Sequence, residues 1–171
     1  MRFAFLALSA FLSAWSIPAS ASTSQVKLVF VEAEWCGFCG LMEPKVEQAL
    51  EDLGDPAIEY QSVDLTRVRG GTDIERSNFF FHELRDNMTS QGLGDFYPKL
   101  KAFGANTGYV LLLASDTHEP LFCGDHRVTV DELKAELKTA KSRVAGRPPN
   151  QRLTRSEAQG SFCLYAYHGM N

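Results

Sequence analysis

A chain of 171 residues with 17 basic and 21 acidic side chains is long enough for one domain with a buried core. Its net charge of −4 excludes a strongly basic surface, so no nucleic-acid partner is expected. Glycine and proline occur at ordinary frequencies, which excludes collagen-like and low-complexity chains.

The first 21 residues have the three-part pattern of a secretory signal peptide. Arg2 supplies a positive charge, residues 3–17 are apolar apart from three serines, and Ala19-Ser20-Ala21 matches an Ala-x-Ala cleavage site. The apolar run is shorter than the roughly 18 residues of a membrane span. We therefore expect cleavage after Ala21 and a periplasmic or secreted protein without membrane contact, in a compartment where disulfides persist.

Two cysteines follow an expected strand and begin an expected helix. The apolar stretch 26–31 predicts a buried parallel strand, and Cys36-Gly37-Phe38-Cys39 comes shortly after it. Apolar residues then recur at helical spacing as far as Leu53, with Pro44 inside, where it should kink the helix. The free N–H groups and positive dipole end of a first helical turn stabilise a thiolate. The first thiol there becomes a better nucleophile, and the second is close enough to form or resolve a disulfide with it.

The residues from Glu32 to Cys39, with Pro44 beyond them, resemble the thioredoxin family, whose pattern is Ala-Glu-Trp-Cys-x-x-Cys before a proline-kinked helix. The similarity covers roughly residues 24–66. It implies an α/β fold over 22–146, with a central mixed sheet flanked by helices.

The resemblance also implies roles for individual residues. Cys36 is the exposed attacking thiol, Cys39 is the buried resolving thiol, and Trp35 shields the pair. Gly37 and Phe38, together with Trp35, are expected to bind the substrate. Sulfur carries the electrons in this chemistry, so no organic cofactor or metal is expected.

One position departs from the family. Many thioredoxins have a buried acid six residues before the first cysteine, which is thought to assist proton removal from the resolving thiol; here that residue is Phe30. Glu32 and Glu34 lie nearby in the sequence, but we do not transfer the role to them. Proton transfer is then expected to rely on water.

Residues 66–97 form an enlarged middle segment relative to a minimal thioredoxin. A helix is expected from Thr72 or Asp73 through about Ser90. Of the three phenylalanines 79–81, either two are buried and one is partly exposed, or they form an apolar substrate surface.

Thioredoxins place a cis-proline opposite the cysteines, and two registers compete for this position. In the first, the apolar run 110–114 is the central strand, 121–124 is the edge strand, and Tyr109 and Val110 face the cysteines. In the second, Tyr97 and Pro98 begin the strand, as in disulfide isomerases. We favour the first register because central parallel strands are continuous apolar runs.

A closing helix is expected from Thr129, since Thr129-Val130-Asp131-Glu132 has capping-box spacing. Residues 147–171 form a tail that ends in an aromatic cluster and is expected to dock on the domain. Four cysteines allow three pairings. Adjacency assigns Cys36 to Cys39, which leaves a structural disulfide between Cys123 and Cys163, or a second redox relay.

No second Cys-x-x-Cys and no histidine pair at ligand spacing accompany the motif, so a metal site is not expected. The sequence favours an exported thiol–disulfide oxidoreductase that acts on protein thiols or disulfides, together with a redox partner protein. It leaves open whether the protein is a reductant, an oxidant or an isomerase. The alternative is a non-catalytic binding module with a structural Cys36–Cys39 disulfide.

Overall fold

The computed structural model describes residues 25–67, 74–102, 106–154 and 157 of the chain. The expected signal peptide and Cys163 lie outside these residues, as do Thr72 and Asp73, the two expected caps of the second helix. Within the described residues no helix is long and apolar enough to cross a membrane.

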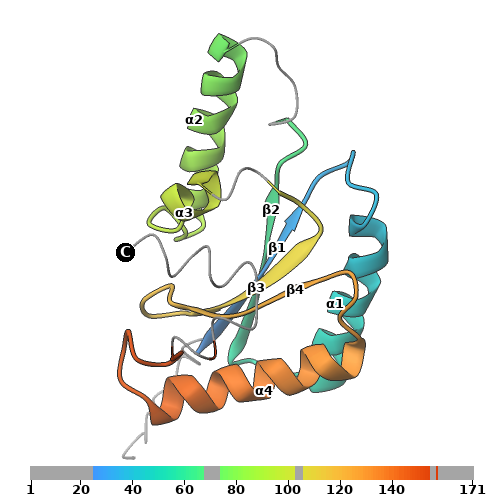
Figure 1. Cartoon of the computed structure of the whole chain (residues 1–171), viewed down its shortest axis with the longest axis vertical. Helices are drawn as coiled ribbons and strands as arrows, with labels where there is room; N and C mark the ends of the chain where they lie inside the picture. Colours follow the sequence, from blue (N-terminus) through green and yellow to red (C-terminus); the bar gives the residue numbers. More distant parts are fainter. Residues whose placement is uncertain (1–24, 68–73, 103–105, 155–156, 158–171) are drawn as a thin grey trace, which may run out of the picture.

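Four strands form a mixed sheet in the order β2-β1-β3-β4 (Figure 1). The strands are β1 Val26–Glu32, β2 Ile58–Asp64, β3 Tyr109–Ala114 and β4 Pro120–Asp125. β1 runs parallel to β2, and β3 runs antiparallel to both of its neighbours, β1 and β4. Almost every residue of β1 and β3 is buried, as expected for central strands that are covered on both faces.

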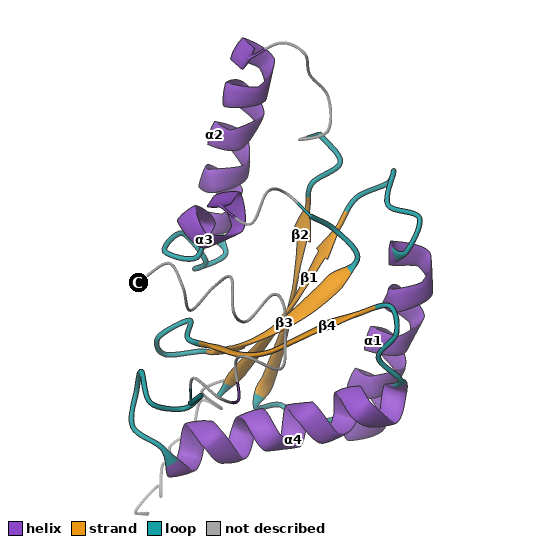
Figure 2. Ribbon diagram, in the orientation of Figure 1, coloured by secondary structure: helices purple, strands orange, loops and turns teal. Residues whose placement is uncertain are grey.

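Four helices cover the two faces of the sheet (Figure 2). They are α1 Cys39–Leu53, α2 Ile74–Ser90, α3 Tyr97–Ala102 and α4 Val130–Gly146. α1 and α4 enclose one apolar cluster with Phe30 and Val110, whereas α2 and α3 enclose another with Val31 and Leu111 on the opposite face. The open α/β sheet with helices on both faces agrees with the thioredoxin-like architecture that the resemblance implied.

The first of the two sequence registers is confirmed. The apolar run 110–114 lies in β3, β4 follows after a turn, and α4 begins after its N-cap Thr129. The second register is wrong, because Tyr97 and Pro98 begin the short helix α3 rather than a strand. The argument from parallel pairing was also wrong, since β3 is antiparallel to both neighbours. Burial on both faces, not strand direction, accounts for its apolar sequence.

The second helix extends from Ile74 to Ser90, in agreement with the expected end. Leu84 and Met88 of this helix are buried against the sheet, and Phe81 is partly buried beside them. The side chains of Phe79 and Phe80 lie outside the described part of the structure, so the two accounts of this segment stay predictions.

The described start of the C-terminal tail contacts the turn between β3 and β4. Glu119 in this turn accepts hydrogen bonds from the backbone N–H groups of Asn150, at 2.9 Å, and Arg152, at 3.1 Å. The buried Arg152 side chain also forms an ion pair with Asp116. These contacts hold residues 150–152 against the domain, while the domain boundaries themselves stay a prediction.

Candidate active site at the start of α1

A disulfide joins Cys36 and Cys39, with an S–S distance of 2.11 Å and a Cα–Cα distance of 5.4 Å. β1 ends at Glu32, and the N–H of Cys36 donates to the carbonyl oxygen of Ala33 at 2.9 Å, which closes a turn. α1 then begins at Cys39. The strand, the turn and the helix thus place both sulfurs at the carboxyl end of β1, the edge where open α/β sheets bind their ligands.

The two half-cystines have different environments. Cys39 is 7% exposed and packs beside Phe30 and Met42, whereas Cys36 is partly exposed. The backbone N–H of Cys39 donates to the Sγ of Cys36 at 3.1 Å. A hydrogen bond of this kind from a helix N-terminus favours a negatively charged sulfur. The local geometry therefore makes Cys36 the sulfur that can be attacked or can attack.

Gly108 closes the far wall of this site. Its φ of +80° lies in the left-handed region, and a Cβ built on it would lie 3.1 Å from the Sγ of Cys36. Its N–H donates to the carbonyl oxygen of Val31 at 2.8 Å, which extends the pairing beyond β3. Only glycine accepts this conformation and this approach without strain.

The sequence placed Tyr109 and Val110 at that wall, and the structure places both in the core. Tyr109 is 3% exposed and belongs to the cluster that Trp35 and Cys36 border, while Val110 is fully buried on the opposite face. Tyr97 is partly buried against the cluster that also contains Tyr109. The substrate-binding role of Tyr109 and Val110 stays a prediction; the close approach of Gly108 could have been suspected only from its position just before β3.

Trp35, next to Cys36, is held in place by Thr66, which lies 31 positions further along the sequence. Its indole Nε1–H donates to the carbonyl oxygen of Thr66 at 3.1 Å. The Thr66 hydroxyl accepts the N–H of Glu34 at 2.9 Å. These contacts fix the loop before the motif to the end of β2, so the orientation of Trp35 depends on tertiary contacts.

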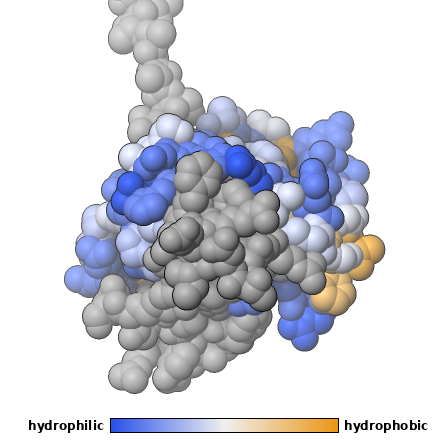
Figure 3. Space-filling view, turned by 90° about the horizontal axis from the view of Figure 1, so that it is seen from above, coloured by the Kyte–Doolittle hydropathy of each residue, from blue (hydrophilic) through white to orange (hydrophobic). Residues whose placement is uncertain are grey.

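Two apolar side chains of the motif region are exposed. Phe38 is 54% exposed and Leu41 is 56% exposed. The Phe38 ring stacks on His126, with 4.1 Å between ring centroids and 9° between planes. Lys45 holds the segment that carries His126, since its Nζ donates to the carbonyl oxygens of His126 and Val128. Figure 3 shows that hydrophobic surface occupies a small area amid a mainly hydrophilic face.

An acidic groove of about 490 Å³ runs beside the disulfide. We use "acidic groove" for the hollow lined by the two half-cystines together with Glu32, Glu34, Glu43 and Asp64. Its other lining residues are small or uncharged. Glu32 and Asp64 are register partners at the ends of β1 and β2, so parallel pairing brings these two carboxylates together.

The acidic groove bears on the missing buried acid. Phe30 is fully buried in the same cluster as Cys39, so the family's acid position is apolar here. Glu32, which lies two residues further on, lines the groove together with both cysteines, and the Ser62 hydroxyl donates to its carboxylate. Side chains alternate along a strand, so Glu32 shares the face of Phe30. The role of the missing acid was not transferred to Glu32 from the sequence, although its two-residue spacing from Phe30 was a usable signal.

Tyr60 of β2 reports the negative potential on this face. Burial, together with the negative charges of Glu32, Glu43 and Glu47, raises the pKa of Tyr60 to about 12. Both causes disfavour a phenolate. Carboxylates from β1 and from α1 therefore act on the same region of the surface.

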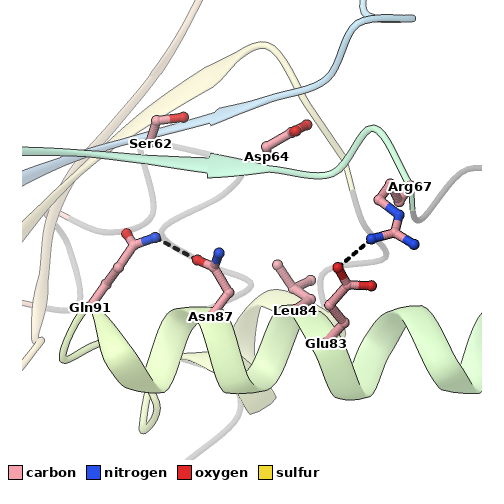
Figure 4. A pocket seen from close by; sticks show the side chains of 7 residues that line it. All are labelled: Ser62, Asp64, Arg67, Glu83, Leu84, Asn87 and Gln91. Atoms are coloured by element: carbon pink, nitrogen blue, oxygen red, sulfur yellow. Dashed lines mark hydrogen bonds and ion pairs between the residues drawn. The ribbon is translucent and has the colours of Figure 1, made fainter.

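A second, smaller hollow of about 170 Å³ lies between β2 and α2 (Figure 4). Asp64 lines it as well as the acidic groove, which makes the two hollows neighbours. Glu83 of α2 forms an ion pair with Arg67, and Gln91 donates to Asn87 at 2.5 Å. Glu83 and Asn87 of α2 are thus held by the loop after β2 and by Gln91, just beyond the helix end.

Cys123 of β4 is 7% exposed and disulfide-bonded. Its expected partner Cys163 lies outside the described residues, so this pairing stays a prediction. Within the part of the chain that is described, no group of three or more His, Cys, Asp or Glu side chains is arranged to hold a metal ion.

Comparisons with known proteins add little to this picture. No protein-family model matches the chain, and a search of curated proteins finds no match. Among the matching solved structures is one described as "Structure of a malarial protein", with a TM-score of 0.41 and 19% sequence identity, covering 68% of this chain and 98% of that one. The chain is thus established as an α/β protein with a disulfide at the start of a helix, and its function has to be argued from the site.

Proposed function

We propose that this protein is an exported thiol–disulfide oxidoreductase that exchanges disulfides with protein substrates through Cys36 and Cys39. The observation that carries the proposal is the asymmetry of the pair: a partly exposed Cys36 that accepts the N–H of Cys39 at 3.1 Å, and a buried Cys39. One sulfur is placed to meet a substrate and the other to resolve the product.

The reaction follows from this arrangement. In the reduced protein the Cys36 thiolate attacks one sulfur of a substrate disulfide, forming a mixed disulfide and expelling the other substrate sulfur as a thiolate. Cys39 then loses its proton and attacks the Sγ of Cys36, which releases the second substrate thiolate. Two electrons pass from the protein to the substrate, and the Cys36–Cys39 disulfide forms. Run in reverse, the same steps oxidise a substrate dithiol.

The surroundings of the disulfide support a protein as the reactant. Phe38 and Leu41 are exposed beside the disulfide and do not line the acidic groove; the Phe38 ring stacks on His126, which follows β4, whereas the groove lies at the ends of β1 and β2. Exposed apolar side chains beside a reactive group are typical of protein contact sites. The proposed compartment is oxidising, so a redox partner protein would set the resting state of the pair.

Disulfide exchange with a protein substrate tests the proposal. The reduced protein should accelerate insulin reduction, or the oxidised protein should accelerate dithiol oxidation, and Cys36→Ser should abolish both accelerations. Cys39→Ser should instead accumulate a mixed disulfide with the substrate through Cys36, because the resolving sulfur is gone.

The rival reading is a binding module whose Cys36–Cys39 bond is structural, which the apolar Phe30 position favours. Under that reading the wild type and Cys36→Ser would react alike, Cys39→Ser would trap nothing, and loss of the bond would appear only as lower stability. Equal exchange rates for wild type and Cys36→Ser would therefore end the enzyme proposal.

A further inference from the structure

We propose that the acidic groove selects substrate polypeptides that carry lysine or arginine next to the disulfide that reacts with Cys36. This inference rests on the proposed function and deepens it, because it names the chemical class of the substrate. It concerns the part of the disulfide's surroundings that Phe38 and Leu41 do not line.

The first argument is position. The groove includes both half-cystines, so a substrate sulfur that approaches Cys36 from this side brings its flanking residues into the groove. Glu32 and Asp64 enter from the paired ends of β1 and β2, and Glu43 enters from α1 one turn after Cys39. The carboxylates thus come from three elements that meet at the reactive sulfurs.

The second argument is that these charges are not compensated by the protein. Among the described residues, the four groove carboxylates form no ion pair, and no lysine, arginine or histidine lines the groove. Glu32 and Asp64 accept hydrogen bonds from hydroxyl groups instead, those of Ser62 and Thr66.

Several carboxylates elsewhere in the described chain are paired with cations. Asp52 pairs with Lys134, Asp55 pairs with Lys141, and Asp116 pairs with Arg152. The protein therefore has cations available for its surface carboxylates, and it places none of them among the residues that line the groove.

The charge pattern of α1, the helix that contributes Glu43 to the groove, supports the same inference. Glu43, Glu47 and Glu51 follow each other at i,i+4 spacing on α1, and like charges at this spacing destabilise a helix. Burial is the largest cause of the raised pKa of Tyr60, and the charges of Glu32, Glu43 and Glu47 add to it, in keeping with a negative field that extends from the groove along the α1 side of the sheet. A field that opposes folding of its own helix is explained by a cationic partner, which it attracts and which neutralises it.

The occupant that fits is a polypeptide. A small cation could neutralise the groove, but it would leave the exposed Phe38 and Leu41 unused. A chain segment that presents a disulfide to Cys36 can place a basic side chain in the groove and an apolar one against Phe38. Charge on one side and apolar surface on the other also fix the direction in which the segment lies.

Two peptides that differ only in charge provide the test. Each contains one cysteine held in the same disulfide, flanked by two lysines in one peptide and by two glutamates in the other. Reduced wild-type protein is mixed with each, and each rate is divided by the rate with 2-mercaptoethanol, which removes the effect of the flanking charges on the leaving thiol. We expect the lysine peptide to react at least about fivefold faster at low salt, and the ratio to fall toward one in about 1 M salt.

Variants locate the effect. Glu32→Gln combined with Glu43→Gln should reduce the preference for the lysine peptide severalfold. Glu136→Gln combined with Asp131→Asn, which removes the same number of charges from α4 outside the groove, is the matched control and should leave the preference unchanged. Circular dichroism before each run confirms that the variants are folded.

The outcomes separate the inference from the proposed function. Equal normalised rates for the two peptides, or a preference that survives the double substitution, would overturn the basic-substrate inference while exchange itself continues. Failure of the wild type to react with either peptide, or equal reaction by Cys36→Ser, would instead overturn the proposed function.

Discussion

The N-termini of α1 and α4 lie on the same face of the sheet, but their free N–H groups are satisfied in different ways. At α4 the Thr129 side chain accepts the N–H of Glu132 and the Glu132 carboxylate accepts the N–H of Thr129, with Asp131 adding a second negative charge. At α1 the N-cap Phe38 makes no side-chain cap bond, and the first turn contains no acidic residue. The side-chain acceptor there is the sulfur of Cys36.

This contrast separates a helix start that is capped by its own side chains from one that carries the disulfide. Capping groups and acidic residues at α4 satisfy the free N–H groups and the dipole, which stabilises the helix. At α1 the free N–H groups and the positive end of the helix dipole act on the sulfur of Cys36 instead. The acidic residues of α1 lie beyond its first turn, and the first of them, Glu43, lines the acidic groove beside the disulfide.

The largest effect is expected from a substitution at Gly108, which lies against Cys36 and Phe38 at the N-terminus of α1. Gly108→Ala forces a Cβ to within 3.1 Å of the Cys36 Sγ and 3.3 Å of the Phe38 Cβ, at a φ of +80°. We expect a loss of about 1–2 kcal/mol in the free energy of unfolding, from left-handed strain alone, together with slower disulfide exchange. Urea denaturation and the insulin assay measure the two effects.

Gly37→Ala is the matched control for this change. A Cβ at Gly37 meets nothing within 4 Å, although this glycine also belongs to the motif loop. Its stability should stay close to that of the wild type. Equal losses for the two variants would show that Gly108 has no special contact with the disulfide.

Removing the N-cap of α4 should lower the stability of the protein and leave its disulfide-exchange rate unchanged. Thr129→Ala removes the cap of α4 and is expected to cost about 1 kcal/mol of unfolding free energy at neutral pH. Backbone and side-chain hydrogen bonds from Thr129 lower the pKa of Glu132, so this part of the cap is present at neutral pH and is lost as falling pH protonates the carboxylate. Denaturation at pH 7 and in acid measures both points, while exchange rates should stay unchanged.

A negative charge placed at the N-terminus of α1 should lower the reactivity of Cys36. Phe38→Asp and Phe38→Asn have the same shape and both can cap α1, but only the aspartate adds a negative charge beside Cys36. We expect Cys36 of the aspartate variant to be alkylated about two- to threefold more slowly at pH 7, because the added charge disfavours the thiolate. Iodoacetamide kinetics on the reduced proteins provide the measurement; equal rates would mean that the α1 dipole does not govern Cys36.

The smallest expected effect is on the pH dependence of stability, through Tyr60, which lies near the acidic residues of α1. Because the pKa of Tyr60 is raised to about 12, its contribution to stability is fully present below the ordinary tyrosine pKa of about 10 and is lost as pH rises between these values. Tyr60→Phe should flatten this part of the stability curve slightly, since Tyr60 is 44% exposed. Denaturation between about pH 10 and 12 tests it, and a curve that keeps the wild-type slope would assign the loss to other groups.

Much of the fold was predictable because it depends on local patterns. The apolar runs of β1 and β3, the helical spacing after Cys39 and the capping box at Thr129 each specify an element from a few neighbouring residues. The choice between the two registers was correct for the same reason: the more apolar run became the central strand. The reason given for it failed, since a local pattern reports burial and does not report strand direction.

Only those parts of the site that lie close together in the sequence were predictable. Cys36 and Cys39 were found from their spacing at a strand-to-helix junction, and their disulfide is present. The groove carboxylates were not found, because Glu32, Glu43 and Asp64 meet through the pairing of β1 with β2 and the packing of α1. Glu32 alone could have been suspected, from its spacing to Phe30; its approach to Asp64, 32 positions further along the chain, has no local signal.

The sequence by itself determined where strands and helices form and which two sulfurs stand at a helix start, because hydrogen bonding within a helix and burial along a strand act over a few residues. Tertiary structure decided that β3 runs antiparallel, that Gly108 rather than Val110 approaches Cys36, and that His126 stacks on Phe38. It also gathered beside the disulfide four carboxylates that form no ion pair within the described part of the chain. These features depend on how distant segments approach one another, which is fixed only when the whole sheet and its two helical layers pack together.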